Sequence, residues 1–267
     1  GTKQLVATAP VFFFFYDGAL VSRGYVRAWR RRRGFYIGLA SSWVFLAYLF
    51  TFGGREVATD AAVTSPWTYA LTQSEIVLHY LRLVVWPKPL LLYYGWPAAE
   101  GVSDVAPALA VIVVLIGVTV LGLVRKKWWG VIGAWFFGIL APTSSFIPLA
   151  HQTFAKQHRL YLPLVACLFL ICLMGLGVYM YADRHGYGRL MALLLAGGCG
   201  AVVLWFGLAT FERNKDYSDP VAFTLSNVRA RPDNWFVRDH LADHLSREER
   251  WKDAAVEYAR VMREKPA

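Results

Sequence analysis

Four basic side chains in a short connection between two long apolar segments are the residues best suited to bind an anion. The connection covers residues 141–163 and contains His151, Lys156, His158 and Arg159. Cationic side chains between membrane spans are costly unless they face water, a partner or an anionic headgroup. Arginine also presents a fork of N–H donors that matches phosphate oxygens. The pattern predicts a lipid-phosphate or donor-binding site; alternatively, the four residues only anchor a span in the headgroup region.

A second group of charged residues lies in the apolar stretch at residues 71–97. Arg82 and His79 are three positions apart, and Glu75 lies four before His79, so all three share one helical face. Arg82 is a further candidate for the donor-binding site. The simpler interpretation is a structural pair of Glu75 with His79 or Arg82.

No pattern typical of a catalytic or metal centre occurs in the sequence. Cys167, Cys172 and Cys199 lie inside apolar segments and have neither zinc-ligand nor disulfide spacing. A P-loop, a dinucleotide fingerprint, an HExxH helix and a nucleophile elbow are all absent. We therefore assign no catalytic residue, no cofactor and no metal to this chain.

The composition predicts several membrane spans rather than one soluble core. Apolar residues make up 57% of the 267 residues and aromatic residues 16%, while only 17% are charged. The net charge of +10 could suggest nucleic acid, but the basic residues cluster in short gaps between apolar segments. That distribution is the positive-inside pattern of membrane proteins. The expected surroundings are membrane lipids, with no nucleic-acid partner.

We predict an all-α fold with a multispan membrane domain over residues 1–211. The six expected spans cover residues 5–21, 35–52, 104–124, 128–150, 160–182 and 190–211. Six arginines place the loop at residues 22–34 on the cytoplasmic side. Residues 71–97 are expected to form an interfacial or re-entrant helix, because a crossing there would put residues 125–127 (Arg-Lys-Lys) on the outer face.

Two local features of these spans carry further expectations. Asp17, an acid inside an apolar segment, is expected to pair with Arg23 or to cap the end of its span. Gly197, Gly198 and Gly200 are expected to allow close helix packing in the last span.

From residue 212 the chain becomes charged, and a 34-residue period indicates a tetratricopeptide-repeat segment on the outer side. Pro232 and Pro266 are one such period apart, so residues 234–267 are interpreted as one full repeat. Residues 219–232 are interpreted as the second helix of the preceding repeat. An array this short needs neighbouring repeats or a partner. The candidate partner-binding residues are Trp235, Leu241 and Tyr258.

Several segments together resemble one protein family. PTSSFIPL followed by HRLYLP in the connection, LTQSEIVLHYLRLVVWPKPLLLYY at residues 71–94, and RNKDYSDP at residues 213–220 occur in order. The chain resembles the C-terminal half of transmembrane-and-tetratricopeptide-repeat proteins, C-type membrane glycosyltransferases related to protein O-mannosyltransferases. The resemblance implies sugar transfer from a polyprenyl-phosphate sugar to protein hydroxyls. His158 and Arg159 would then hold the phosphate.

The chain departs from that family in ways that leave two functions open. Gln157 and Gln4 stand where the family has acidic residues, and the family's catalytic acid lies upstream of residue 1. The first hypothesis is a glycosyltransferase-like protein with a retained donor site. The alternative is a non-catalytic membrane subunit or scaffold that docks partners through its repeats. A transporter is a third hypothesis. The sequence speaks against it, since no polar residues recur at mid-span as an ion path would need.

Overall fold

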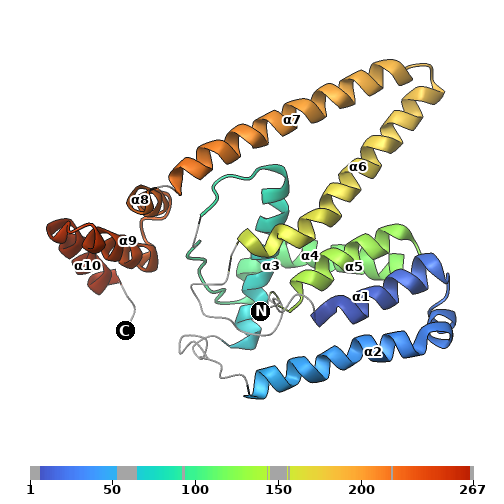
Figure 1. Ribbon diagram of the computed structural model, residues 1–267, viewed down its shortest axis with the longest axis horizontal. Coiled ribbons are helices and arrows are strands. Elements are labelled where there is room, and N and C mark those ends of the chain that lie inside the picture. The colour runs from blue at the N-terminus through green and yellow to red at the C-terminus, as the bar shows by residue number, and fades with distance from the viewer. Residues whose placement is uncertain are drawn as a thin grey trace. The chain divides into compact units, whose positions relative to one another are not determined.

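The computed structural model describes an all-helical chain over residues 7–52, 65–91, 94–142, 144, 155, 157–217 and 219–264, with no strand in that part (Figure 1). Its contacts form two compact units. The first comprises residues 1–90 and 96–168, and the second comprises residues 91–95 and 169–267. The expected boundary followed residue 211, whereas the contacts divide the chain within the long helix at Tyr161–Arg184.

The first unit begins with a tight helical reversal. Helix α1 (Ala9–Tyr16) continues as the π-helix η2 (Asp17–Val21), after which the chain turns into α2 (Tyr25–Phe52). Helix α1 lies alongside α2 and α5 (Trp128–Leu140) (Figure 1). Asp17 is consequently flanked by the first half of α2.

Helix α3 (Pro66–Val85) is a buried helix that packs on α4 (Val102–Val124). Its first turn is capped by the Ser65 hydroxyl, which accepts a hydrogen bond from the Thr68 N–H, and Pro66 needs no partner there. The helix ends at Val85 instead of continuing toward residue 97, because prolines follow at positions 87 and 89. Nine of its twenty residues are buried.

Helices α4 and α5 form a close hairpin that depends on glycine. A Cβ at Gly122 would overlap the Trp129 ring, and a Cβ at Gly130 would overlap the backbone of α4. In the described part of the chain, nothing lies within 4 Å of a Cβ placed at Gly197, Gly198 or Gly200, where close helix packing was expected. The close contact falls in α4–α5 because a three-residue turn joins these helices and brings Gly122 and Gly130 together.

Among the described residues, three helices are long and apolar enough to cross a membrane, which indicates a membrane protein. They are α4, α6 (Tyr161–Arg184) and most of α7 (Gly188–Asp216). Residues 9–21 and helix α5 are apolar but shorter than a span. Helix α5 ends at Leu140, and much of the rest of the expected span at residues 128–150 lies outside the described residues.

Three short helices follow α7. They are α8 (Pro220–Ala230), α9 (Trp235–Arg247) and α10 (Trp251–Glu264). Helices α9 and α10 pack side by side and α8 packs on α9. Their common core consists of Val221, Val228, Val237, Leu241, Leu245 and Ala254.

Candidate functional site

Arg159 lies in a buried position where the connection meets α6. It belongs to a single 3-10 turn (Gln157–Leu160), and its side chain is 6% exposed. Its guanidinium donates a hydrogen bond to the hydroxyl of Tyr69, which is fully buried in the first turns of α3. Burial raises the pKa of the Tyr69 phenol, and the Arg159 charge offsets part of that rise. A neutral phenol therefore holds the arginine in place.

Of the other basic residues predicted for this site, the structure describes only the side chain of Arg82. His151 and Lys156 lie outside the described residues, and the side chain of His158 is likewise not described. Arg82 is exposed in the last turn of α3. It lies thirteen residues after Tyr69, about 20 Å along the helix axis at 1.5 Å per residue. Of the five predicted donor-binding residues, only Arg159 is a buried cation in the described part of the chain.

The extended segment after α3 folds back along that helix. The indole N–H of Trp96 donates to the Glu75 carboxylate over 3.0 Å, and the Trp96 ring lies 5.1 Å from the His79 ring. One turn earlier on α3, the Thr72 hydroxyl accepts a hydrogen bond from the Ala99 N–H at 2.9 Å. The carboxylate thus bonds to a tryptophan, where a pair with His79 or Arg82 was expected. Neither Trp96 nor Tyr69 carries a sequence signal for these roles, because their partners are distant in the chain.

Asp17 forms a buried polar cluster at the turn between η2 and α2. It is 4% exposed and accepts hydrogen bonds from the Ser22 and Tyr36 hydroxyls. It also pairs with Arg32 over 3.0 Å, while Arg23 was the expected partner. The reason is the reversal after η2, which brings residues on the early turns of α2 alongside Asp17. Residue 32 interrupts the helical geometry of α2 at this point, with φ −130° and ψ 26°.

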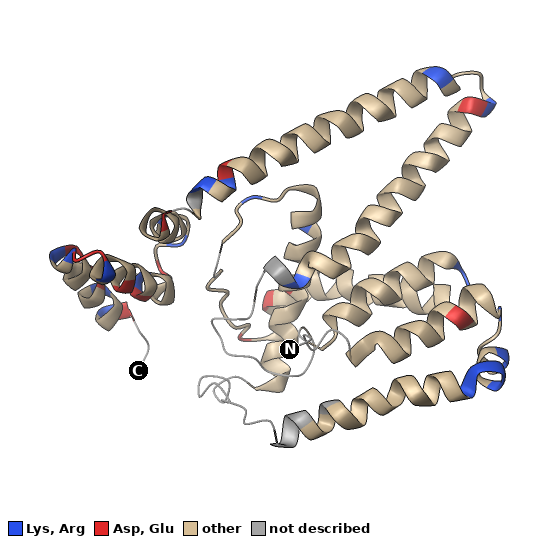
Figure 2. Cartoon of the chain, in the orientation of Figure 1, with Lys and Arg blue, Asp and Glu red and all other residues tan. Residues whose placement is uncertain are grey.

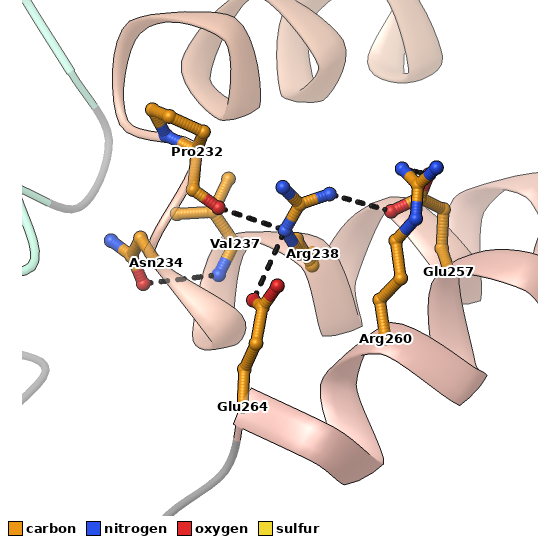
Figure 3. A network of polar contacts seen from close by, with 7 residues as sticks. All are labelled: Pro232, Asn234, Val237, Arg238, Glu257, Arg260 and Glu264. Atoms are coloured by element: carbon orange, nitrogen blue, oxygen red, sulfur yellow. Dashed lines mark hydrogen bonds and ion pairs between the residues drawn. The ribbon is translucent and has the colours of Figure 1, made fainter.

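In the helices after α7, Arg238 joins α9 to α10 (Figure 3). Its Nε donates to the Pro232 carbonyl at 2.9 Å and lies 3.2 Å from the Glu264 carboxylate. Its Nη1 lies 3.0 Å from Glu257, which also pairs with Arg260 at 3.0 Å. Arg238 is only 9% exposed, so these carboxylates compensate a largely buried charge.

The three residues proposed for partner binding lie mainly in or against the core of these helices. Leu241 is 3% exposed within that core and Tyr258 packs against it, while Trp235 is half-buried at the start of α9. Exposed apolar side chains occur instead on α10, at Trp251, Val256 and Met262. These last three are the stronger candidates for an apolar contact.

No cluster of three or more His, Cys, Asp or Glu residues that could hold a metal occurs in the described part of the chain. Comparisons with protein-family models, characterised proteins and solved structures find no match for this chain.

Proposed function

We propose that this chain is a membrane protein of C-type glycosyltransferase-like fold that binds a polyprenyl-phosphate sugar through Arg159. The observation that carries the proposal is the buried guanidinium held by Tyr69. A buried charge is costly, and arginine is the side chain best suited to bind phosphate in such a setting. The activity expected from the resemblance is transfer of the sugar to protein hydroxyls.

The position of Arg159 along α4 supports an outer-side donor site. Tyr69 lies one turn from Thr72, which bonds to the chain just before α4 begins. The basic turn at residues 125–127 follows the other end of α4, about 34 Å away for 23 residues. That length matches a hydrocarbon core of about 30 Å. Under the positive-inside rule the basic turn is cytoplasmic and Arg159 faces outward.

In this proposal the domain has six spans, α3 is an interfacial or re-entrant helix, and α8–α10 form outer-side tetratricopeptide helices. Burial of Thr72, Gln73 and Ser74 supports the assignment of α3, since three consecutive polar residues suit a protein interior better than lipid. The length and pairing of α9 and α10 are compatible with one 34-residue repeat.

A non-catalytic scaffold is the second candidate function. It is favoured by Trp251, Val256 and Met262 on α10, which are 65%, 52% and 78% exposed. Trp251 and Met262 are eleven residues apart and so lie on one face of α10, and apolar side chains exposed on one helical face suit a further repeat or a protein partner.

A binding titration of the purified protein with a short-chain polyprenyl-phosphate sugar distinguishes the two. Arg159→Ala should weaken binding about ten-fold or more, since a charge-assisted hydrogen bond contributes roughly 1.5–3 kcal/mol. Arg82→Ala is the matched control, because it removes the same charge about 20 Å along α3 from Tyr69. Arg159→Lys keeps the charge in case the alanine variant fails to fold. No saturable binding, or equal loss in Arg82→Ala, would leave the scaffold as the better account.

A further inference from the structure

A basic cavity lies at the end of α4 opposite the Arg159 site. Its volume is about 740 Å³, and it is lined by Arg23, Gly24, Tyr25, Val26, Arg27, Arg30, Arg31 and Lys126. A smaller cavity of about 350 Å³ shares Arg23 and Lys126 with it and adds Lys127 and Trp128. Figure 2 shows Lys and Arg gathered at the start of α2 and at the α4–α5 turn. We name the larger one the basic pocket.

One hydrogen bond joins the two loops that make the basic pocket. The Tyr25 hydroxyl donates to the Leu123 carbonyl in the last turn of α4 over 2.7 Å. Gly18 in η2 allows this arrangement, because a Cβ there would overlap the Tyr25 ring. Phe14 and Phe15 of α1 pack on the same ring, with centroids 5.6 Å and 6.1 Å away. The pocket is therefore built by contacts between α1, η2, α2 and α4.

The charge in the basic pocket is uniformly positive. Five of its eight lining residues are cationic and none is acidic. The nearby carboxylate of Asp17 is already bonded to Arg32, Ser22 and Tyr36. Like charges held together repel one another, and an anion between them removes that cost.

Lys126 occupies a backbone position that usually belongs to glycine. The α4 helix ends in a Schellman turn, in which the Lys126 N–H bonds to the Leu123 carbonyl and the Lys127 N–H to the Gly122 carbonyl. Lys126 has φ +52° there, whereas the equivalent turn after α6 uses Gly186 at φ +83°. Arg23, also in the pocket, has φ +48°. Two cationic residues thus hold strained conformations at one cavity, an arrangement that is typical of functional sites.

We propose that the basic pocket binds the headgroup of a membrane lipid that carries two closely spaced phosphates. The chemistry that it recognises is a diphosphate or bisphosphate anion, which suits five cations better than a single phosphate does. Val26, Trp29 and Trp128 beside the pocket are 67%, 47% and 46% exposed, so acyl chains of such a lipid would meet apolar side chains. This site is independent of the Arg159 site and of the proposed transferase activity.

The test is native mass spectrometry of the purified full chain in detergent, titrated with cardiolipin and with phosphatidylglycerol at equal total charge. Cardiolipin should bind at least about ten-fold more tightly. The double variant Arg27→Gln/Lys126→Gln should lose that preference. Arg33→Gln/Arg125→Gln, which removes two charges from the same loops but outside the pocket lining, should keep it. Equal affinity for the two lipids, or equal loss in both double variants, would overturn the proposal.

Two single substitutions, one at Lys126 and one at Tyr25, distinguish a lipid-binding role of these residues from a purely structural one. Lys126→Gly should raise thermal stability, because glycine relieves the positive φ, yet weaken cardiolipin binding. Tyr25→Phe should weaken binding without changing any charge, by releasing the two loops. Binding that is unchanged in both variants would overturn the proposed site.

Inorganic pyrophosphate distinguishes a lipid from a soluble anion. A site for lipid should bind pyrophosphate at least about a hundred-fold more weakly than cardiolipin, since the apolar contacts are lost. Equal affinity for pyrophosphate would overturn the lipid assignment and make the ligand a soluble diphosphate.

Discussion

Three charged side chains that are buried away from bulk water are each bonded to a specific partner. Arg159 is bonded to a buried phenol, Asp17 to Arg32, and Arg238 to two carboxylates. In each case the sequence shows the charged residue, but its partner comes from another element. The local environment of a charge is therefore a property of the fold, even where the charge itself is evident in the sequence.

Arg238→Ala should loosen α9 and α10 selectively. Removing one member of a largely buried charge pair costs roughly 3 kcal/mol, because the remaining carboxylates lose their compensation. Hydrogen exchange of the full chain should show faster exchange in α9 and α10 and no change in α4. Arg247→Ala, which breaks an exposed pair with Asp243, should cost about 0.5 kcal/mol or less. Similar effects of the two substitutions would contradict the buried role of Arg238.

At the scale of elements, the α4–α5 hairpin is a close backbone contact of the first unit. Gly122 and Gly130 bring the two backbones together, and the same hairpin positions the basic turn at residues 125–127. Helix α3 is constrained differently, by the returning segment that bonds to Thr72 and Glu75. Neither contact follows from hydropathy, which reports only that the segments are apolar.

Gly130→Ala should destabilise the hairpin, since the added methyl meets backbone that cannot move aside without parting the helices. Overpacking of this kind costs about 1–3 kcal/mol, which would lower the Tm by about 5 °C. Gly138→Ala in the same helix meets nothing within 4 Å and should leave the Tm unchanged or raise it. A thermal melt of the purified protein in detergent compares them. An equal fall in both would mean that helix propensity or lipid contact, not close packing, explains the effect.

At the scale of the whole molecule, the three long apolar helices found among the described residues indicate a membrane protein, and a charged helical tail follows them. The side of the membrane on which each loop lies is part of the proposed topology, which rests on the distribution of basic residues. In that proposal the positive-inside rule puts the turn at residues 125–127 on the cytoplasmic side and the tail on the outer side.

Cysteine labelling in whole cells checks that topology. In a variant without Cys167, Cys172 and Cys199, an impermeant maleimide should label Glu248→Cys from outside and leave Lys127→Cys unlabelled. Both positions are exposed, so permeabilised cells provide the accessibility control. Labelling of both positions from the same side would contradict the proposed topology, and with it the outer-side placement of Arg159.

The sequence by itself determined that the chain is all-α, that it contains membrane-spanning segments, and that residues 104–124 and 160–182 belong to long apolar helices. Such features follow from hydropathy and short-range periodicity, which are properties of neighbouring residues. Tertiary structure alone decided that Tyr69 holds Arg159, that Arg32 rather than Arg23 pairs with Asp17, and that the turn after α4 completes a basic pocket. Those contacts join residues from different elements, and they depend on how the helices pack. Local sequence patterns carry no information about that packing.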